Sequence, residues 1–271
     1  TFVINGNVDI DSAGCGLAAN STSDTAINVN GGAGELIVGS ISTVGGINDA
    51  GHFTTDTVLT GASPLTDPYE DLEIPDYEGC TRNEMRDGDV KRFGTVHVFC
   101  GGWTVSGSEE LEAGNIYIID GGDLDVGNGE SLDGTAGATI IMTNSGGEDY
   151  GSYGRLDIKG ALDIAAPVEN DLDNDWSDFA GVAIYSDRTE EYDPRSNQCH
   201  DIKGDVRIHG AAYFPTTCVD IGGNADVEPA DGLCTRLIAT TIKLHGNPAI
   251  GNDCQTSSAK DIGAVTVRLT L

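Results

Sequence analysis

Acidic side chains alternate with other residues in one polar stretch of the chain, residues 168–178. The carboxylates at nearly alternate positions belong to Asp171, Asp173, Asp175 and Asp178. Oxygen ligands spaced in this way are typical of a calcium-binding loop. The glycine and the glutamate that an EF-hand loop has at its sixth and twelfth positions are replaced by Trp176 and Val182. The stretch is therefore a candidate calcium site, and a solvated acidic loop is the simpler interpretation.

The motifs of the common catalytic sites are absent from the sequence. It contains no Gly-Lys-Ser/Thr phosphate loop, no Gly-x-Ser-x-Gly turn and no His-Glu-x-x-His motif. Cys199-His200 with Cys218 could supply zinc ligands, but no second close ligand pair accompanies them, so a disulfide is favoured. Glycosidases need two carboxylates about 5–9.5 Å apart, and a chain with 44 acidic residues meets that requirement by chance. We therefore expect no enzymatic activity and assign no catalytic residue.

Two further polar motifs could carry a function or a modification. Asp187-Arg188 is the most promising polar site of the sequence, with a structural contact between acid and base as the alternative. Asn20-Ser21-Thr22 matches the acceptor pattern for N-glycosylation, so Asn20 is a glycosylation candidate.

The elements that must position these side chains are short strands separated by glycine corners. The repeated unit is apolar-x-apolar-x-Gly-x-apolar-x-apolar, and its clearest copy spans residues 156–164. The central glycines at 160, 204, 223 and 246 recur at multiples of roughly 20 residues, as stacked repeats do. Gly and Asn supply positive φ at the corners. The pattern predicts an all-β fold, a right-handed β-helix (β-solenoid) in which each coil stacks on the one before. A β-sandwich is the alternative.

The cysteines have a spacing that fits such coils. Seven cysteines favour an oxidising compartment. One coil of separation brings two residues to adjacent strands, within reach of a disulfide. The pairs separated by about one coil are Cys80–Cys100, Cys199–Cys218 and Cys234–Cys254. We predict these three disulfides, which leaves Cys15 unpaired, and buried free thiols are the alternative.

The chain divides into three stretches but is predicted to form a single β-solenoid domain, residues 1–271. Strand patterns with glycine and asparagine corners fill residues 1–60, the N-terminal coils. Residues 61–92 contain three prolines and many acids with little periodicity, which predicts a loop excursion. The main solenoid is expected over residues 93–271.

The charge of the chain excludes several classes of partner. Acidic residues outnumber basic ones 44 to 14, which gives a net charge of −30. Nucleic acid requires a basic surface, so nucleic-acid binding is excluded. No apolar run in this chain reaches 18 residues, so no membrane span is expected within it. Together with the cysteines, these features predict an extracellular or cell-surface location.

Several phrases of the sequence occur in an order that resembles a known family. They are Asp67-Pro68-Tyr-Glu-Asp-Leu72-Glu-Ile-Pro75, Phe99-Cys100-Gly-Gly-Trp103, Leu111-Glu-Ala-Gly114-Asn-Ile-Tyr117, Ala180-Gly181-Val-Ala-Ile-Tyr-Ser-Asp187-Arg188 and Gly210-Ala-Ala-Tyr-Phe-Pro215. This succession is similar to the C-terminal, extracytoplasmic, β-rich region of TadG-like proteins from tight-adherence (Flp) pilus systems. The resemblance implies a secreted or envelope-held module connected with pilus assembly and surface attachment, and it implies no catalytic residue.

These observations predict a non-enzymatic extracellular structural or adhesive protein. The ends of a solenoid are unpaired sheet edges, so self-association into filaments is expected, with other pilus or surface proteins as further partners. The alternative is a β-helix protein that binds or degrades polysaccharide, with surface glycans as its ligands. Calcium is the one candidate cofactor.

Overall fold

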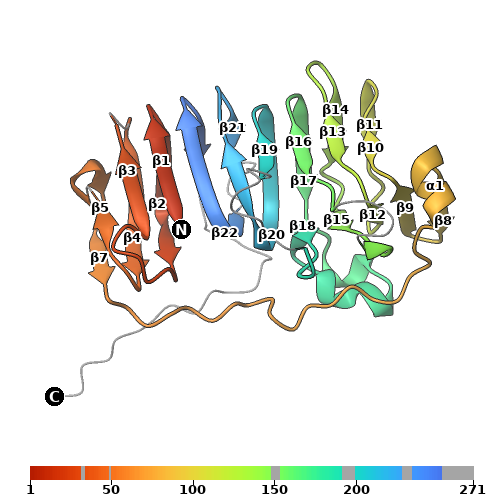
Figure 1. Cartoon of the computed structure of the whole chain (residues 1–271), viewed down its shortest axis with the longest axis horizontal. Coiled ribbons are helices and arrows are strands. Elements are labelled where there is room, and N and C mark those ends of the chain that lie inside the picture. Colours follow the sequence, from red (N-terminus) through yellow and green to blue (C-terminus); the bar gives the residue numbers. More distant parts are fainter. Residues whose placement is uncertain (32–33, 49, 148–152, 191–198, 228–233, 252–271) are drawn as a thin grey trace.

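Short strands dominate the computed structural model, as Figure 1 shows, and the predicted all-β class is confirmed. The structure describes residues 1–251, except residues 32–33, 49, 148–152, 191–198 and 228–233. The predicted main solenoid is therefore described only as far as residue 251. No helix in the described part of the chain is long and apolar enough to cross a membrane.

Most strands lie in three rows, and within each row neighbouring strands are parallel and in register. The first row contains β9 (Val96–Cys100), β12 (Ile116–Asp120), β15 (Thr139–Thr143), β18 (Val182–Ser186), the middle of β20 (Asp205–Ile221) and the start of β22 (Thr235–Gly246). The second row contains β10 (Trp103–Thr104), β13 (Leu124–Val126), β16 (Leu156–Ile158), β19 (His200–Ile202), the ends of β20 and β22, β1 (Phe2–Gly6), β3 (Ile27–Asn30) and β5 (Ile47–Asn48).

The third row contains β11 (Ser108–Glu110), β14 (Ser131–Gly134), β17 (Ala161–Ala165), the start of β20, β21 (Asp226–Val227), β23 (Ala249–Gly251), the starts of β2 (Asp9–Ala19) and β4 (Leu36–Thr43), and β6 (Phe53–Thr54). Each coil visits the rows in the order first, second, third. The ends of β2 and β4 lie between third-row and second-row strands in the chain, so they occupy the side of the first row. Strand β7 (Thr57–Thr60) pairs with the end of β4 and lies on the same side.

The repeated unit of the sequence explains how a coil is built. In the copy at residues 156–164, Leu156, Ile158, Leu162 and Ile164 are buried in a core that runs from Phe2 to Leu244. Asp157, between two of them, stays partly exposed. Side chains of successive strand residues point to opposite faces, so the alternation places apolar groups inside the stack. Gly204 stacks on Gly160 so closely that a Cβ there would lie 1.9 Å from the Gly160 carbonyl oxygen.

The order of the coils differs from the expectation that each stacks on the one before. Strand β1 lies between β3 and β22, and Phe2, Ile4 and Gly6 are register partners of Ile242, Leu244 and Gly246. The start of β2 pairs in the same way with β23. We call these two pairings the seam. The N-terminal coils thus continue the stack beyond β22 (Figure 1), because parallel edges of similar shape meet there regardless of their distance in the chain.

The predicted excursion is an ordered connection between the two ends of the stack. Residues 61–80, which we call the strap, leave β7 at one end of the stack and run across the ends of the strands to the other end (Figure 1). Helix α1 (Arg82–Asp87) follows, and β8 (Val90–Phe93) then pairs antiparallel with β9. The short 3₁₀ helices η1 (Ala50–His52), η3 (Glu169–Asp171) and η4 (Asn174–Phe179) complete the described helices.

Two of the predicted disulfides are present. Cys199–Cys218 joins adjacent second-row strands, with Cα atoms 4.6 Å apart. Cys80–Cys100 has a Cα–Cα distance of 5.6 Å, but it joins the end of the strap to β9 and not two stacked coils.

The remaining three cysteines change the predicted scheme. The prediction that Cys15 is unpaired is wrong, because Cys15 is disulfide-bonded, and so is Cys234. Cys254 lies outside the described residues, so the predicted pair Cys234–Cys254 stays a prediction. The spacing argument left Cys15 over because no other cysteine lies about one coil away from it in the sequence.

Candidate functional site

The richest set of polar contacts lies where the strap crosses the carboxyl ends of the first-row strands. Strands β12, β15 and β18 are buried over their whole length. One face contacts the main core, and the other contributes Ile118, Ile141 and Tyr185 to a second core that includes Tyr69 and Leu72 of the strap. Sheets covered on both faces have continuous apolar strands. The strap is therefore an integral layer of the fold, and polar groups at its edges are held in fixed positions.

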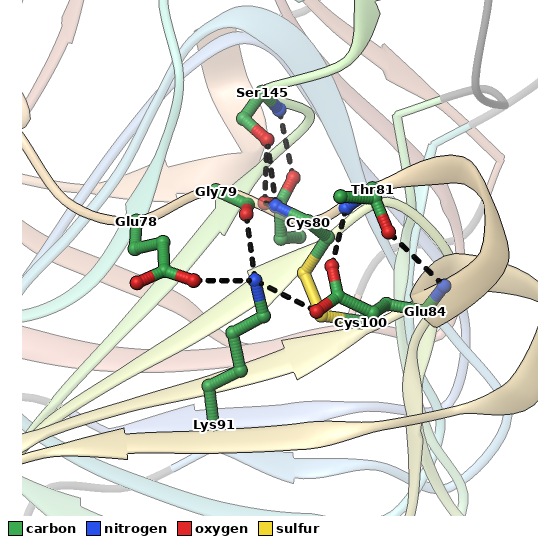
Figure 2. Close-up of polar contacts among 9 residues, drawn as sticks. Glu78, Gly79, Cys80, Thr81, Glu84, Lys91, Cys100 and Ser145 are labelled. Atoms are coloured by element: carbon green, nitrogen blue, oxygen red, sulfur yellow. Dashed lines mark hydrogen bonds and ion pairs between the residues drawn. A yellow bond between two sulfur atoms is a disulfide. The ribbon is translucent and has the colours of Figure 1, made fainter.

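The carboxylate of Asp120 fixes the end of the strap, where Figure 2 shows Cys80 and Ser145. Asp120 is fully buried and ends β12. Its Oδ2 accepts hydrogen bonds from the Cys80 amide at 2.9 Å and from the Ser145 hydroxyl at 2.6 Å, and its Oδ1 accepts one from the Ser145 amide at 2.7 Å. A buried charge is tolerated when it is fully hydrogen-bonded. Together with the Cys80–Cys100 bridge, this network joins the strap to β9, β12 and the turn after β15.

Helix α1 and β8 are attached to the same place through Lys91. Its ammonium group lies 3.2 Å from Glu78, 3.0 Å from Glu84 and 3.0 Å from the Gly79 carbonyl oxygen (Figure 2). Glu84 also accepts a hydrogen bond from the Thr81 amide at 2.6 Å, which completes a capping box at the start of α1. The Thr81 amide and Lys91 lower the pKa of Glu84 to about 2.

A second clamp holds the middle of the strap. Arg188 donates hydrogen bonds to Asp67 at 2.8 Å and to the Tyr69 carbonyl oxygen at 2.6 Å, and it also contacts the Tyr213 hydroxyl. Tyr213 donates to the same Asp67 carboxylate at 2.6 Å. Burial opposes ionisation of Asp67, but the hydrogen bonds from Tyr213, the Tyr69 amide and Arg188 outweigh it and lower its pKa. The proposed polar motif at Asp187-Arg188 therefore acts structurally through its arginine.

A polar pocket of about 220 Å³ opens between the two attachment points. The strap contributes Ile74, Pro75, Asp76 and Tyr77, and the ends of β15 and β18 contribute Thr143, Asn144, Ser145 and Asp187. Thr143 donates a hydrogen bond to Asp187 at 2.6 Å. Burial raises the pKa of the Tyr77 hydroxyl, and the Asp120 carboxylate raises it further. The pocket offers carboxylate, amide and hydroxyl groups, which suit a small ligand rich in hydroxyl groups.

A buried cluster beside the pocket contains the residue types of a catalytic triad without its geometry. Ser186 donates a hydrogen bond to Glu190 at 2.6 Å. His200 is fully buried, and its Nδ1 accepts the Leu156 amide at 3.0 Å, so its Nε2 carries the hydrogen that faces Thr217 at 3.0 Å. No nitrogen of His200 is free to take the proton of Ser186, so the cluster is not arranged for nucleophilic catalysis.

Burial sets the protonation of this cluster. It raises the pKa of Glu190 to about 7, and the nearby Asp187 adds to the increase. Burial lowers the pKa of His200 to about 3, with a further contribution from Arg155. His200 is therefore neutral at physiological pH, and its 4.0 Å approach to Glu190 is not an ion pair.

The candidate calcium residues do not form a site. The described residues contain no group of three or more carboxylate, histidine or cysteine side chains that could hold a metal ion, so Asp171, Asp173, Asp175 and Asp178 do not converge. The reason is the local fold: η3 and η4 break the stretch, and Asp173 instead accepts a hydrogen bond from Thr95 at 2.7 Å. Trp176, between the aspartates, is buried in the second core. Cys199 and Cys218 are bonded to each other and are not available to zinc.

Asn20 has a structural partner. Its side-chain amide donates to the Leu65 carbonyl oxygen and accepts from the Leu65 amide, both at 2.8 Å, and this attaches the start of the strap to the N-terminal coils. Asn20 is exposed. Its glycosylation stays a prediction, and a glycan on this nitrogen would compete with the contact to the strap.

Several residues of this region escaped the sequence analysis. Asp120 ends an apolar run and Thr81 stands three residues before Glu84, so both carried local signals: an acid closing a buried strand, and the Ser/Thr-x-x-Glu pattern of a capping box. Tyr213 carried no such signal, because its partner Asp67 lies far away in the sequence, and Lys91 carried none because no periodic pattern links it to Glu78 and Glu84.

Comparison of the chain with protein-family models, with curated proteins and with solved structures finds no match. The contacts described above are therefore the basis for assigning a function.

Proposed function

We propose that this chain is an extracellular structural or adhesive protein built as a right-handed β-solenoid. The observation that carries the proposal is the long in-register array of parallel strands, strapped along one side and bridged by disulfides. Connections between parallel strands are right-handed in nearly all proteins, which supports the proposed hand. Stacked coils that share one core resist local opening, because each coil is held by both neighbours.

Attachment to surfaces is the role that this architecture and the resemblance to TadG-like proteins favour together. Disulfides support an extracytoplasmic location, since they persist in oxidising compartments. The strap contacts described above hold polar groups in structural roles, with buried apolar side chains beneath them. A rigid body that presents a large acidic surface suits contact with other surface proteins in a tight-adherence pilus system.

The test is made in the organism that encodes the chain. We expect antibody to label the protein on intact cells, and deletion of the gene to reduce attachment of cells to a solid surface, with recovery on complementation. A protein found only inside the cell, or attachment unchanged by the deletion, would contradict the proposal.

The polar pocket favours a second candidate function, the binding of surface glycans. Asp76, Asp187 and Thr143 could accept or donate hydrogen bonds to the hydroxyl groups of one sugar unit. Glycan-array binding that is lost in Asp76→Asn and kept in an Asp56→Asn control, away from the pocket, would support this candidate. Equal signals for both variants would exclude the pocket as the glycan site.

A further inference from the structure

The two ends of the strand stack are covered to different extents. At one end, the outer edge of β9 pairs with β8 through four antiparallel register positions, and α1 packs beside it. At the other end, β7 pairs with β4 on one side only, and no strand pairs with its outer edge among the described residues. Strands β7 and β9 lie on the same side of the stack. In a head-to-tail assembly, the β7 strand of one copy would have to pair with the outer edge of β9 in the next copy, and β8 already occupies that edge.

Strand β7 has none of the usual features that protect an edge. Natural edge strands carry charges, prolines or bulges, or are covered by another segment. The sequence of β7 is Thr-Val-Leu-Thr, and all four residues are exposed. Strand β8 at the opposite end carries Lys91 and Arg92. Among the described residues, therefore, nothing occupies the outer edge of β7, and this edge can pair with another strand.

Side chains at β7 also indicate that no segment in the described part of the chain covers the core there. Leu17, Ile41 and Val58 are register partners in successive coils, so they form one column on the inner side of the stack. Ile41 is 1% exposed, whereas Val58, the last member, is 46% exposed, and Leu59 beside it is 42% exposed. A side chain in a core column is buried when a further layer covers it. No described residue supplies that layer for Val58.

We propose that the uncovered β7 end binds a second copy of this chain, with the two β7 strands paired antiparallel about a two-fold axis. Antiparallel pairing with Val58 opposite Val58 places both valines on the inner side, where each covers the other. The backbone groups of both edges are then satisfied. A two-fold contact of this kind closes after two copies and does not grow. The inference deepens the proposed structural role, because it names the partner and replaces a filament with a dimer.

The mass of the protein in solution tests the inference. Multi-angle light scattering of the full chain, in buffer of moderate salt to screen the acidic charge, is expected to give twice the monomer mass of 28.1 kDa. Val58→Lys is expected to weaken the dimer by at least about tenfold in Kd, because it places a charge in the paired edge. Phe93→Lys is the matched control, since Phe93 is 43% exposed at the opposite end, and it should leave the dimer unchanged.

Each other result would overturn the inference. A wild-type chain that stays monomeric at high micromolar concentration, or that grows into longer polymers, contradicts a closed dimer. Loss of the dimer in Phe93→Lys with retention in Val58→Lys would move the contact to the other end. Circular dichroism of both variants checks that they fold. The cell-attachment assay tests the proposed function separately. A monomeric protein that still supports attachment would contradict the dimer and leave the proposed function standing. A dimeric protein that is absent from the cell surface would contradict the proposed function and leave the dimer standing.

Discussion

Phe2 and Ile242 are register partners in neighbouring parallel strands, although they belong to opposite ends of the chain. The N-terminal amino group continues this contact by donating a hydrogen bond to the Thr240 carbonyl oxygen at 2.9 Å. The seam makes the N-terminal coils the last layers of the stack. The strap is needed for this reason: it carries the chain from the end of those layers back to the first one.

The seam depends on a glycine contact that no other residue can make. Gly6 has φ of +118°, and a Cβ there would lie 2.6 Å from the Gly246 carbonyl oxygen. Gly6→Ala is therefore expected to lower the free energy of unfolding by about 2 kcal/mol or more, measured by urea titration. Gly51→Ala is the control, because nothing lies within 4 Å of a Cβ at that position. Equal stability of the two variants would show that the seam is not packed as described.

The Arg188 clamp should contribute measurably to the attachment of the strap. Arg188→Ala removes hydrogen bonds to Asp67 and to the Tyr69 carbonyl oxygen. About a third of both charged side chains is exposed, so we expect a loss of only about 1–2 kcal/mol. Proteolysis within residues 61–80 should become faster at the same time.

Arg207→Ala serves as the comparison for the clamp. Arg207 pairs with Asp163 at 3.7 Å on an exposed surface, and its removal should change stability by less than about 0.5 kcal/mol. If both arginine variants lose the same small amount, the clamp does not hold the strap.

Glu190 should make the protein less stable as the pH rises. Its pKa is about 7 in the folded protein, above its ordinary value of 4.5. The folded state therefore binds more protons between about pH 4.5 and 7, and stability is lost as the pH rises through that window. Glu190→Gln removes the buried charge, so above pH 7 it should stabilise the protein by up to about 3 kcal/mol relative to wild type.

Thermal or urea unfolding at pH 5 and pH 8 measures this difference. Glu110→Gln, which removes a carboxylate from an exposed position, is the matched control. A Glu190→Gln variant with the wild-type pH dependence would show that Glu190 is not protonated in the folded protein.

The Cys80–Cys100 bridge should stabilise the end of the strap. The bridge closes a loop with a sequence separation of 20, for which chain entropy predicts about 3 kcal/mol. The double variant Cys80→Ala/Cys100→Ala is expected to lose about that amount in urea titration. The hydrogen bonds of Asp120 should still keep the strap in place in this double variant. Protease should therefore cleave the strap more slowly in the double variant than in a triple variant that also carries Asp120→Ala. Equal cleavage of the two would show that Asp120 does not hold the strap.

Sequence patterns predicted the short strands and their glycine corners well because both are local features of the chain. The alternation in residues 156–164 and the corner at Gly160 depend on neighbours in the chain, and the Cys199–Cys218 bridge follows from the length of one coil. The all-β class and the Cys199–Cys218 disulfide follow from such local rules, whereas Cys80–Cys100 has the same spacing but joins the strap to β9.

The stacking order could not be predicted in the same way. Every coil presents similar parallel edges, so nothing in the sequence of β1 specifies β22 as its neighbour. The strap was missed for a related reason: Tyr69 and Leu72 show no period, and their burial depends on Tyr185 and Tyr213, more than one hundred residues away. Alternate oxygens in residues 171–178 suggested a calcium loop, but two 3₁₀ helices occupy the stretch, and no group of three or more possible metal ligands forms among the described residues.

Cross-linking across the seam tests the central claim most directly. Asn5 and His245 are register partners in β1 and β22, and Asn30 lies one further strand away, opposite Asn5. Adjacent strands are about 4.8 Å apart, which a disulfide can span, whereas the distance across two strands cannot be bridged. In Asn5→Cys/His245→Cys, mild oxidation followed by mass spectrometry should find the new bridge within one chain, and Asn30→Cys/His245→Cys should give none. Absence of the first bridge, or equal yields of both, would contradict a stack in which the N-terminal coils continue from β22.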